Sequence, residues 1–380
     1  MTSQTCFIEP LDVLFLRGNK LFGDPGSYGE SLVPPWPSVA AGALRSRILA
    51  DDGIDFVAFA QGKLEHPALG TPAAPGSFTL TAFQLARRHL DGRIEMLIAP
   101  PADLIIAESP TAQPLVRRLQ PTVLPGGLEV SSSTSWLPVL AEPERSKPGN
   151  GYWLTESGWI KYLAGQTPTA ADLVRSSDLW AIDHRVGVGL DPEQGSAADG
   201  RLFSTQAVSM AKRETHCFDV GFLASVRGAQ LPAGGLLRFG GDGRGAALHG
   251  ADKAQPKADL AALARARRCR IVLTSPGLFP QGWQPPGIDA EGNFTLGGIS
   301  AKLVCAAIPR AETVSGWDIA QRQPKAAQRT APTGSVYWLD QLDASADALG
   351  KLAENGLWND PCQDASRRAE GFNRFAFAAF

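Results

Sequence analysis

The sequence predicts an α+β fold made of two ferredoxin-like units, each with the element order β-α-β-β-α-β, with glycine- and proline-rich insertions and one projecting β-hairpin. Two observations lead to this fold class. The chain opens with a predicted strand, helix and hairpin, which is the first half of such a unit. In addition, 40 glycines and 29 prolines among 380 residues indicate many loops. We place the first unit at residues 1–228 and the second at residues 229–380.

The first strand and the first helix follow from local residue types. Residues 7–17 predict a strand that ends in a glycine-bearing turn. The prolines in 34–37 exclude a helix before Ser38, because each proline ring fixes φ and removes a backbone donor. Ser38 suits the N-cap, since its hydroxyl can accept a hydrogen bond from the first turn. We therefore expect a helix over 39–49 that stops at the Asp-Asp-Gly of 51–53.

A hairpin and an insertion follow the first helix. Residues 77–86 and 94–98 predict two strands joined by a turn with Asp-Gly at its tip. Residues from about 100 to 165 carry many prolines and a serine run, and they predict an irregular insertion. Four aromatic residues in it could stack bases or form a small core over the insertion, and we favour the core. These residues are Tyr152, Trp153, Trp159 and Tyr162.

Two glycine-containing stretches lie near the middle of the chain. Residues 185–212 predict a long hairpin that projects from the body, and residues 216–227 predict a strand. The loop at 240–246 has the spacing of a dinucleotide-binding motif, but no helix starts at its glycines, so we reject that function. Two interpretations of the loop remain open. Its backbone lies against phosphates with Arg244 on an oxygen pair, or it is a tight turn with a solvated arginine.

The second unit takes its elements from the rest of the chain, after the glycine-rich loop. A helix is predicted over 257–268, with several arginines near its end. The further predicted elements are strands at 270–275, 294–298, 302–308 and 334–339 and a helix at 343–352.

Composition excludes several classes of protein. The formal net charge of −2 means that any nucleic-acid site must be a local patch. The five cysteines lie far apart and show no metal-ligand spacing, so we expect no zinc, no disulfide framework and no cofactor. The N-terminus lacks the features of a signal peptide, and no apolar run approaches the ~18 residues of a membrane helix. We therefore expect a cytoplasmic protein with no membrane partner.

Several sequence blocks, taken in order, resemble one protein family. They are Phe-Leu-Arg-Gly-Asn-Lys-Leu-Phe at 15–22, Pro-Pro-Trp-Pro-Ser-Val-Ala-Ala-Gly-Ala-Leu-Arg at 34–45, Arg-Val-Gly-Val-Gly at 185–189, Phe-Gly-Gly-Asp-Gly-Arg-Gly-Ala at 239–246, and Gly-Trp-Asp at 316–318 through Pro-Thr-Gly-Ser-Val-Tyr-Trp at 332–338. Together they resemble the family of subunit 3 of the Cmr complex, a RAMP protein of the type III-B CRISPR effector.

The resemblance implies a function in antiviral defence. Such a subunit holds the 5′ tag of the guide CRISPR RNA and joins the large cyclase-like subunit to the first backbone RAMP subunit. Its 185–212 hairpin would be a thumb that reaches a neighbouring subunit or RNA. We expect RNA contacts from Arg17, Lys20, Ser38, Arg45, Arg185, Lys212, Arg213, Gly241, Gly243, Arg244 and Arg329.

Arg45 and Arg47 lie on one helix, and the resemblance separates their roles. Residues two apart on a helix point about 200° from each other, so the two cannot serve one site equally. The family's Gly-Ala-Leu-Arg block ends at Arg45, so the RNA contact is assigned to Arg45 and little is expected from Arg47. Arg45 would reach back beside the helix N-terminus, with Arg17 and Lys20 bordering the same pocket.

The C-terminal segment also falls on a family pattern, but it departs from it. The family usually has a Gly-Phe-Gly segment here, whereas this chain has Asn373 in Gly371–Phe375. We therefore assign no RNA contact to this segment.

The residues suggest a binding protein rather than an enzyme. General acid–base cleavage of RNA needs a poised group such as histidine, and the five histidines are scattered along the chain. His184, just before Arg185, is the strongest candidate, although a structural hydrogen bond is the favoured role. No small-molecule substrate is expected. The alternatives are a stand-alone RAMP endoribonuclease that processes CRISPR RNA, and a scaffold subunit that contacts only protein.

Overall fold

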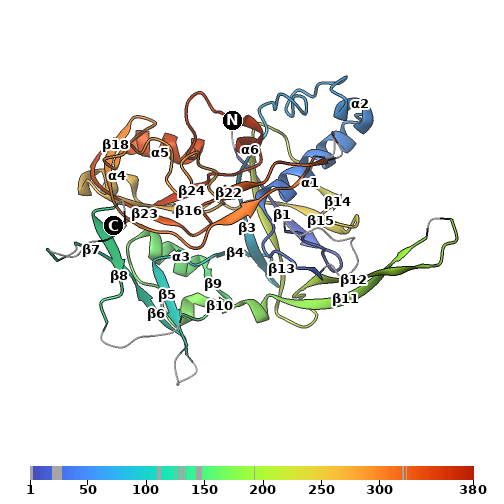
Figure 1. Ribbon diagram of the computed structural model, residues 1–380, viewed down its shortest axis with the longest axis horizontal. Coiled ribbons are helices and arrows are strands. Elements are labelled where there is room, and N and C mark those ends of the chain that lie inside the picture. Colours follow the sequence, from blue (N-terminus) through green and yellow to red (C-terminus); the bar gives the residue numbers. More distant parts are fainter. Residues whose placement is uncertain are drawn as a thin grey trace.

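The computed structural model describes residues 3–18, 28–108, 113–123, 125–126, 130, 132, 134–142, 148–191, 193–318, 321 and 323–380. Its strands are mostly antiparallel and form a main sheet of eight strands and a second sheet of five, with a small number of helices (Figure 1). This mixed α/β architecture confirms the predicted class at that level. In the described part of the chain, no helix is long and apolar enough to cross a membrane.

The main sheet has the strand order β10-β9-β4-β3-β13-β1-β15-β14. In that order the strands span Leu173–Arg175, Tyr152–Thr155, Ile94–Ile98, Thr79–His89, Phe218–Arg227, Gln4–Pro10, Gly245–Ala251 and Gly234–Arg238. Helix α1 (Pro37–Asp51) packs on this sheet, and the short helix α2 (Phe56–Ala60) follows it. Ala40 and Leu44 of α1 share one buried core with Ile8 and Phe222 of the sheet.

The second sheet has the strand order β17-β18-β23-β16-β24. In that order the strands span Asn293–Leu296, Ile299–Ala307, Val336–Asp343, Cys269–Leu273 and Phe375–Ala378. Helices α4 (Leu260–Ala266) and α5 (Ala346–Asn355) pack on it, and Leu263 and Leu349 share a core with Ile271. Helix α6 (Ala365–Ala369) lies between α5 and β24 in the chain.

Both sheets contain the strand order of a ferredoxin-like unit. There the first and second strands run parallel with the third between them, and the fourth lies beside the first. In the main sheet β1, β3, β13 and β15 take these four places, and in the second sheet β16, β18, β23 and β24 take them.

Each half keeps only one of the two expected helices. In the main sheet α1 connects β1 to β3, but the connection from β13 to β15 contains strand β14 instead of a helix. In the second sheet α5 connects β23 to β24, but the connection from β16 to β18 contains strand β17 and no helix. The complete six-element units predicted from the sequence are therefore not confirmed.

The loop at 240–246 lies inside the main sheet. It connects β14 to β15, and β15 pairs with β1 at the start of the chain. The chain therefore leaves the main sheet only after Ala251. The domain boundary at 228 stays a prediction, but the glycine-rich loop does not lead into the second sheet as expected.

Helix α1 starts two residues earlier than predicted. It spans Pro37–Asp51, its N-cap is Trp36, and no side chain caps it. Ser38 is the second helical residue and not the cap. The reason is that proline suits the first helical position, where its fixed φ is already helical and its missing N–H would be unpaired anyway. The predicted stop at 51–53 is confirmed.

The long projecting hairpin is confirmed. Strands β11 (Trp180–Leu190) and β12 (Ala197–Met210) pair antiparallel, and β2 (Tyr28–Gly29) pairs with β12. In Figure 1 this hairpin extends far beyond the rest of the molecule. Its base is joined to the body by a bridge between Leu14 and Val208.

The insertion is more regular than its composition suggested. It contains two short antiparallel ladders, β5 (Leu104–Ala107) with β6 (Leu115–Arg118) and β7 (Gln120–Val123) with β8 (Trp136–Val139). Helix α3 (Glu156–Leu163) follows β9, and two single turns of 3₁₀ helix lie at Ala170–Asp172 and Ser176–Asp178.

The predicted core of the insertion is confirmed. All four of its aromatic residues are buried, and none is exposed for base stacking; they are Tyr152, Trp153, Trp159 and Tyr162. Trp159 and Tyr162 pack with Trp338 of the second sheet.

Two further ladders lie between β18 and β23. Strand β19 (Glu312–Val314) pairs with β22 (Gln328–Thr330), and β20 (Trp317–Asp318) pairs with β21 (Gln323–Pro324). Val314 of this segment packs against Trp36 and Phe372. The segment therefore connects the start of α1 with the C-terminal part of the chain.

Candidate nucleic-acid interface

Arginines from distant parts of the sequence gather around the ring of Phe15. The guanidinium carbon of Arg244 lies 5.0 Å from the ring centroid, and that of Arg185 lies 6.0 Å from it. Arg17 donates from Nη2 to Oδ1 of Asp242 at 3.1 Å. Arginine favours aromatic faces because the negative face of the ring attracts the cation. We call Phe15, Arg17, Arg185, Asp242 and Arg244 the Phe15 cluster.

The loop at 240–246 is a tight turn folded against the backbone of Phe15. The amide of Gly241 donates to the Phe15 carbonyl at 2.8 Å. Gly240 has a φ of +79°, and a Cβ there would come within 2.9 Å of the same carbonyl oxygen. Gly243 also lies in the left-handed region, with a φ of +63°. Glycine is therefore needed here for backbone conformation and, at Gly240, also for space.

Arg244 is not a solvated arginine, as one interpretation of the loop had it. Its Nη1 donates to Oδ2 of Asp12 at 2.8 Å, and 29% of its side chain is exposed against 64% for Asp12. Its Nε is buried and has no hydrogen-bond partner in the described chain. An ion pair with so exposed a carboxylate contributes at most about 1 kcal/mol, so a phosphate could replace Asp12 at small cost.

Lys212 and Arg213 belong to a neighbouring ion-pair network. Nε of Arg213 lies 3.2 Å from Oδ2 of Asp219, and Nζ of Lys212 lies 3.6 Å from Oε1 of Glu9. Arg88 binds both acids, at 2.6 Å to Glu9 and 3.2 Å to Asp219. Burial raises the pKa of Asp219, but hydrogen bonds from Arg213 and Arg88 outweigh it and lower that pKa overall. Both predicted cations therefore have a structural role, Arg213 in holding the buried Asp219 and Lys212 in holding the partly buried Glu9.

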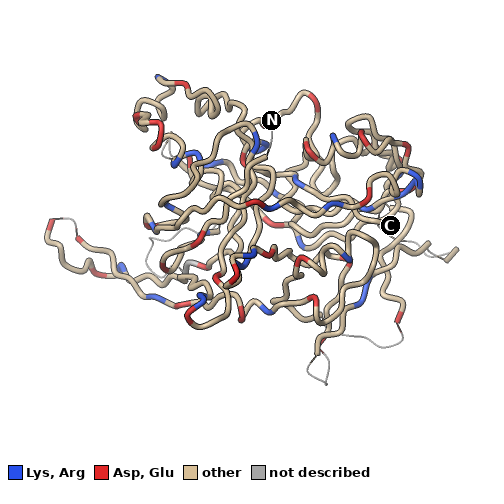
Figure 2. The backbone as a smooth tube through the Cα atoms, turned by 180° about the vertical axis from the view of Figure 1, so that it is seen from behind, with Lys and Arg blue, Asp and Glu red and all other residues tan. Residues whose placement is uncertain are grey.

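The network and the Phe15 cluster meet at one end of the main sheet. Pro10 pairs with Ala246 beside the glycine-rich loop, and Nζ of Lys212 donates to the Pro10 carbonyl. Figure 2 shows basic and acidic positions interleaved around the base of the projecting hairpin. The surface is therefore a mixed-charge area in which cations are paired with acids, and not a continuous basic patch.

Comparison with known proteins now identifies the family. A family model described as "CRISPR-associated protein (Cas_Cmr3)" matches residues 6–377. The chain belongs to this family. The match confirms the resemblance that was inferred from separate sequence blocks.

Two solved structures contain chains that are similar to this Cas_Cmr3 family member. One is a chain of the cryo-EM structure of the Type III-B Cmr-beta bound to cognate target RNA and AMPPnP, state 1, with a TM-score of 0.51, 14% sequence identity and 98% of both chains covered. A chain of the Type III-B Cmr-beta bound to cognate target RNA has a TM-score of 0.48 and 14% identity, with 98% of this chain and 96% of that chain covered. No curated protein matches the chain.

Arg45 does not lie where the sequence placed it. Its guanidinium carbon is 4.9 Å from the centroid of the Phe78 ring, and its Nε is buried without a hydrogen-bond partner in the described chain. Burial lowers the pKa of Arg45, and the charge of Glu370 partly opposes this. The guanidinium of Arg45 therefore packs on a buried ring, whereas Arg17 is paired with Asp242 of the glycine-rich loop.

The remaining predicted residues of the first blocks have separate places. Arg47 binds Asp51 at 2.8 Å and donates to the carbonyl of Leu236, which ties α1 to β14. Ser38 lies in the first turn of α1. Lys20 lies outside the described residues.

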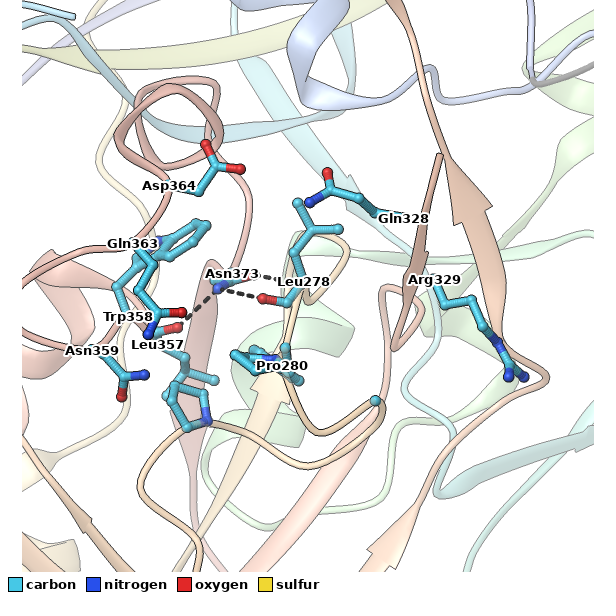
Figure 3. A pocket seen from close by; sticks show the side chains of 13 residues that line it. Leu278, Pro280, Gln328, Arg329, Leu357, Trp358, Asn359, Gln363, Asp364 and Asn373 are labelled. Carbon is cyan, nitrogen blue, oxygen red and sulfur yellow. Dashed lines mark hydrogen bonds between the residues drawn. The ribbon is translucent and has the colours of Figure 1, made fainter. Parts of the chain in front are cut away.

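Arg329 lies at the rim of a different cavity, of about 460 Å³ (Figure 3). The cavity is lined by Leu278, Pro280 and Trp358 among others, and Nε1 of Trp358 is buried with no partner in the described chain. In Figure 3 the guanidinium of Arg329 points away from Asn373. The structure therefore does not bring Arg329 to the Phe15 cluster.

Asn373 explains why the C-terminal segment departs from the family pattern. Its φ is +58°, in the left-handed region that glycine adopts easily and that asparagine tolerates. Its side chain accepts from the amide of Leu278 at 2.6 Å and donates to the carbonyl of Leu357 at 2.9 Å. Only 1% of Asn373 is exposed. In this chain the residue connects three segments of the interior.

The histidines form no acid–base pair with each other. His66 binds Asp52 at 2.7 Å, His89 binds Glu95 at 3.0 Å, and His249 binds Glu9 at 2.9 Å. His184 is exposed on β11, opposite Gln206. Among the described residues, no group of three His, Cys, Asp or Glu side chains could hold a metal ion.

Phe15, Asp12 and Asp242 are residues of this surface that sequence reasoning missed. Phe15 was counted as part of a strand, because it lies in an apolar run after β1. In the structure β1 ends at Pro10, and residues beyond it leave the sheet to meet the loop at 240–246. The sequence feature that could have indicated Phe15 is its position two residues before Arg17, in the same block.

Proposed function

We propose that this chain is the RNA-binding, non-catalytic subunit of a cytoplasmic type III-B CRISPR effector that holds the 5′ tag of the guide RNA. One observation carries this proposal. Three of the blocks that resemble the family, at 15–22, 185–189 and 239–246, supply Phe15 with Arg17, Arg185 and Arg244 of a single cluster. Residues far apart in the sequence therefore contribute to one surface that can bind phosphates.

The charges of the cluster suit an exchange of partners. Arg17, Arg185 and Arg244 each hold an acid that is about half exposed or more, namely Asp242, Asp183 and Asp12. Such exposed ion pairs contribute about 0–1 kcal/mol, whereas a bidentate arginine–phosphate contact is stronger and fixes orientation. RNA phosphates can thus displace the carboxylates. With a net charge of −2, we expect the free chain to bind RNA weakly and the assembled complex to bind it tightly.

The projecting hairpin supports a role in assembly. Val186, Val188, Leu190 and Leu202 are large apolar residues with exposed side chains near its end. Val188 lies directly opposite Leu202, so these two share one face of the hairpin. Exposed apolar groups of this kind mark contact sites. We propose that the hairpin reaches a neighbouring subunit or its RNA, and that the chain joins the large cyclase-like subunit to the first backbone subunit.

The test is guide-RNA affinity of complexes assembled with single variants Arg17→Ala, Arg185→Ala and Arg244→Ala. Each loss should be about 1–3 kcal/mol, since each removes a charge-assisted contact. Arg93→Ala is the matched control, because Arg93 is an exposed arginine in the turn after β3 whose nearest acid atom, in Asp91, is 4.0 Å away. Unchanged affinity in all three variants would favour a scaffold that contacts only protein.

A further inference from the structure

A second, larger cavity lies between the two sheets. Its volume is about 870 Å³, within the range of small-molecule sites. Gln4, Thr81 and Arg227 line it from the main sheet, and Arg374 and Phe377 line it from the C-terminal part of the chain. Neither the Phe15 cluster nor the cavity of Figure 3 shares these residues.

Arg374 is the most unusual group in the wall of this cavity. Only 4% of the residue is exposed, its Nη1 donates to the backbone carbonyl of Glu354 at 2.7 Å, and its Nε has no hydrogen-bond partner in the described chain. No carboxylate among the described residues forms an ion pair with it. Burial, and then the charges of Arg227 and Arg368, lower the pKa of Arg374 to about 10. A buried cation without a counter-ion is costly, so the site favours an anion.

The charges around the cavity also favour an anion. Its lining contains the cations Arg227, Lys253, Lys257 and Arg374 and the acids Asp252 and Glu354. Oε2 of Glu354 forms an ion pair with Nη1 of Arg227 at 3.6 Å. Nζ of Lys253 forms an ion pair with Oε1 of Glu156 at 2.7 Å. Positive charge is therefore in excess.

The remaining walls of the cavity contain aromatic side chains and side-chain amides. Phe375 and Phe377 provide buried aromatic surface beside Arg374. Gln84 donates to Oε1 of Gln255 at 2.9 Å, whereas Nε2 of Gln255 is buried with no partner in the described chain. An unused amide donor next to apolar surface suits the polar edge of a flat ring.

We propose that this cavity binds a small organic anion that combines a phosphate group with a flat polar ring, the chemistry of a nucleoside monophosphate. Arg374 and Arg227 would bind the phosphate, and the amide of Gln255 would donate to the edge of the ring. The ligand is bound and not converted, so the site is compatible with a protein that has no small-molecule substrate. The inference does not depend on the proposed RNA function.

The experiment measures binding to the purified full-length chain by calorimetry and by the melting temperature. The probes are AMP, UMP, inorganic phosphate and adenosine. AMP or UMP should bind and raise the melting temperature, because a ligand that binds only the folded state stabilises it. Adenosine should bind at least tenfold more weakly, since it lacks the phosphate.

Variants assign the binding to this cavity. Arg374→Gln should weaken AMP or UMP binding at least tenfold. Because Arg374 is buried and its variant could unfold, Arg227→Gln and Gln255→Leu provide a second test, each with an expected loss of severalfold. Arg329→Gln, at the rim of the other cavity, is the matched control and should bind normally.

Three results would overturn the proposal. One is the absence of binding by every probe at millimolar concentration. Another is binding that folded Arg227→Gln and Gln255→Leu variants leave unchanged. The third is competition between AMP and a tag-sequence RNA, which would make the cavity part of an RNA site. Guide-RNA affinity of complexes with Arg227→Gln should stay unchanged, whatever the outcome for the Phe15 cluster.

Discussion

The arginines of the Phe15 cluster and the buried Arg270 show opposite uses of the same side chain. Arg270 is completely buried, and each of its three nitrogens donates a hydrogen bond, to Asp103, to the carbonyl of Tyr162 and to that of Ala379. The arginines of the Phe15 cluster instead hold exposed acids. An arginine whose partners are fixed in the interior stabilises the fold, whereas one with a replaceable partner is available to a ligand.

The largest expected effect is a loss of stability when the buried ion pair between Arg270 and Asp103 is broken. Asp103→Ala leaves the guanidinium of Arg270 buried without its counter-ion, and removing one partner of such a pair costs about 3–5 kcal/mol. Chemical denaturation of the purified chain measures this loss. Asp12→Ala is the control, because it removes the exposed partner of Arg244 and should cost under about 1 kcal/mol. Similar losses from both variants would mean that burial does not distinguish the two sites.

Arg45 provides an intermediate case, half-buried and packed on Phe78. The sequence assigned it to RNA, with an expected loss of about 1–3 kcal/mol in guide-RNA affinity on Arg45→Ala and little from Arg47→Ala. From its position in the structure we now expect a loss of about 1–2 kcal/mol in unfolding free energy and no change in RNA affinity. Thermal melting and RNA titration of the assembled complex, with Arg47→Ala alongside, separate the outcomes. A loss of RNA affinity at unchanged stability would restore the first assignment.

A smaller effect is expected at the Phe15 cluster, where a substitution should increase guide-RNA affinity. If RNA phosphates displace Asp12 from Arg244, then Asp12→Asn removes a competitor. Guide-RNA affinity of the complex should rise by up to about 1 kcal/mol, roughly fivefold. Asp51→Asn is the control, since Asp51 pairs with Arg47, which belongs to α1 and not to the Phe15 cluster. A fall in affinity on Asp12→Asn would show that this acid holds Arg244 in its binding position.

The smallest expected effect concerns His184. Pure protein incubated with labelled repeat RNA, with and without divalent metal, should produce no site-specific cleavage, and His184→Ala should not change that. The reason is that His184 lies on an exposed strand, where the residue paired opposite it is Gln206 and not a second histidine. Specific cleavage that is lost in His184→Ala would instead establish the endoribonuclease.

The elements that local chemistry determines were predictable from the sequence. The end of α1 follows from Asp-Asp-Gly, and the projecting hairpin from its glycines and alternating apolar residues. The start of α1 was missed by two residues because proline was treated only as a helix breaker, although it suits the first position.

Contacts between distant segments were the part that the sequence could not supply. Phe15 meets Arg185 and Arg244 only because β1 ends early and the loop at 240–246 folds onto it. Helix geometry correctly placed Arg45 and Arg47 on different sides of α1. It could not predict that Arg45 packs on Phe78 and that Arg47 donates to the carbonyl of Leu236. Periodicity describes which face a residue lies on, whereas its partner depends on packing.

During synthesis, β1 leaves the ribosome long before the strands with which it pairs. This strand, buried at Cys6, Phe7 and Ile8, pairs with β13 on one side and β15 on the other. Roughly 200 residues separate them, since β1 ends at Pro10 and β13 begins at Phe218. At about 5–20 residues per second the ribosome needs roughly 10–40 seconds to deliver the partner strand. For that interval an apolar strand has both edges open, which is the condition under which nascent chains aggregate or depend on chaperones.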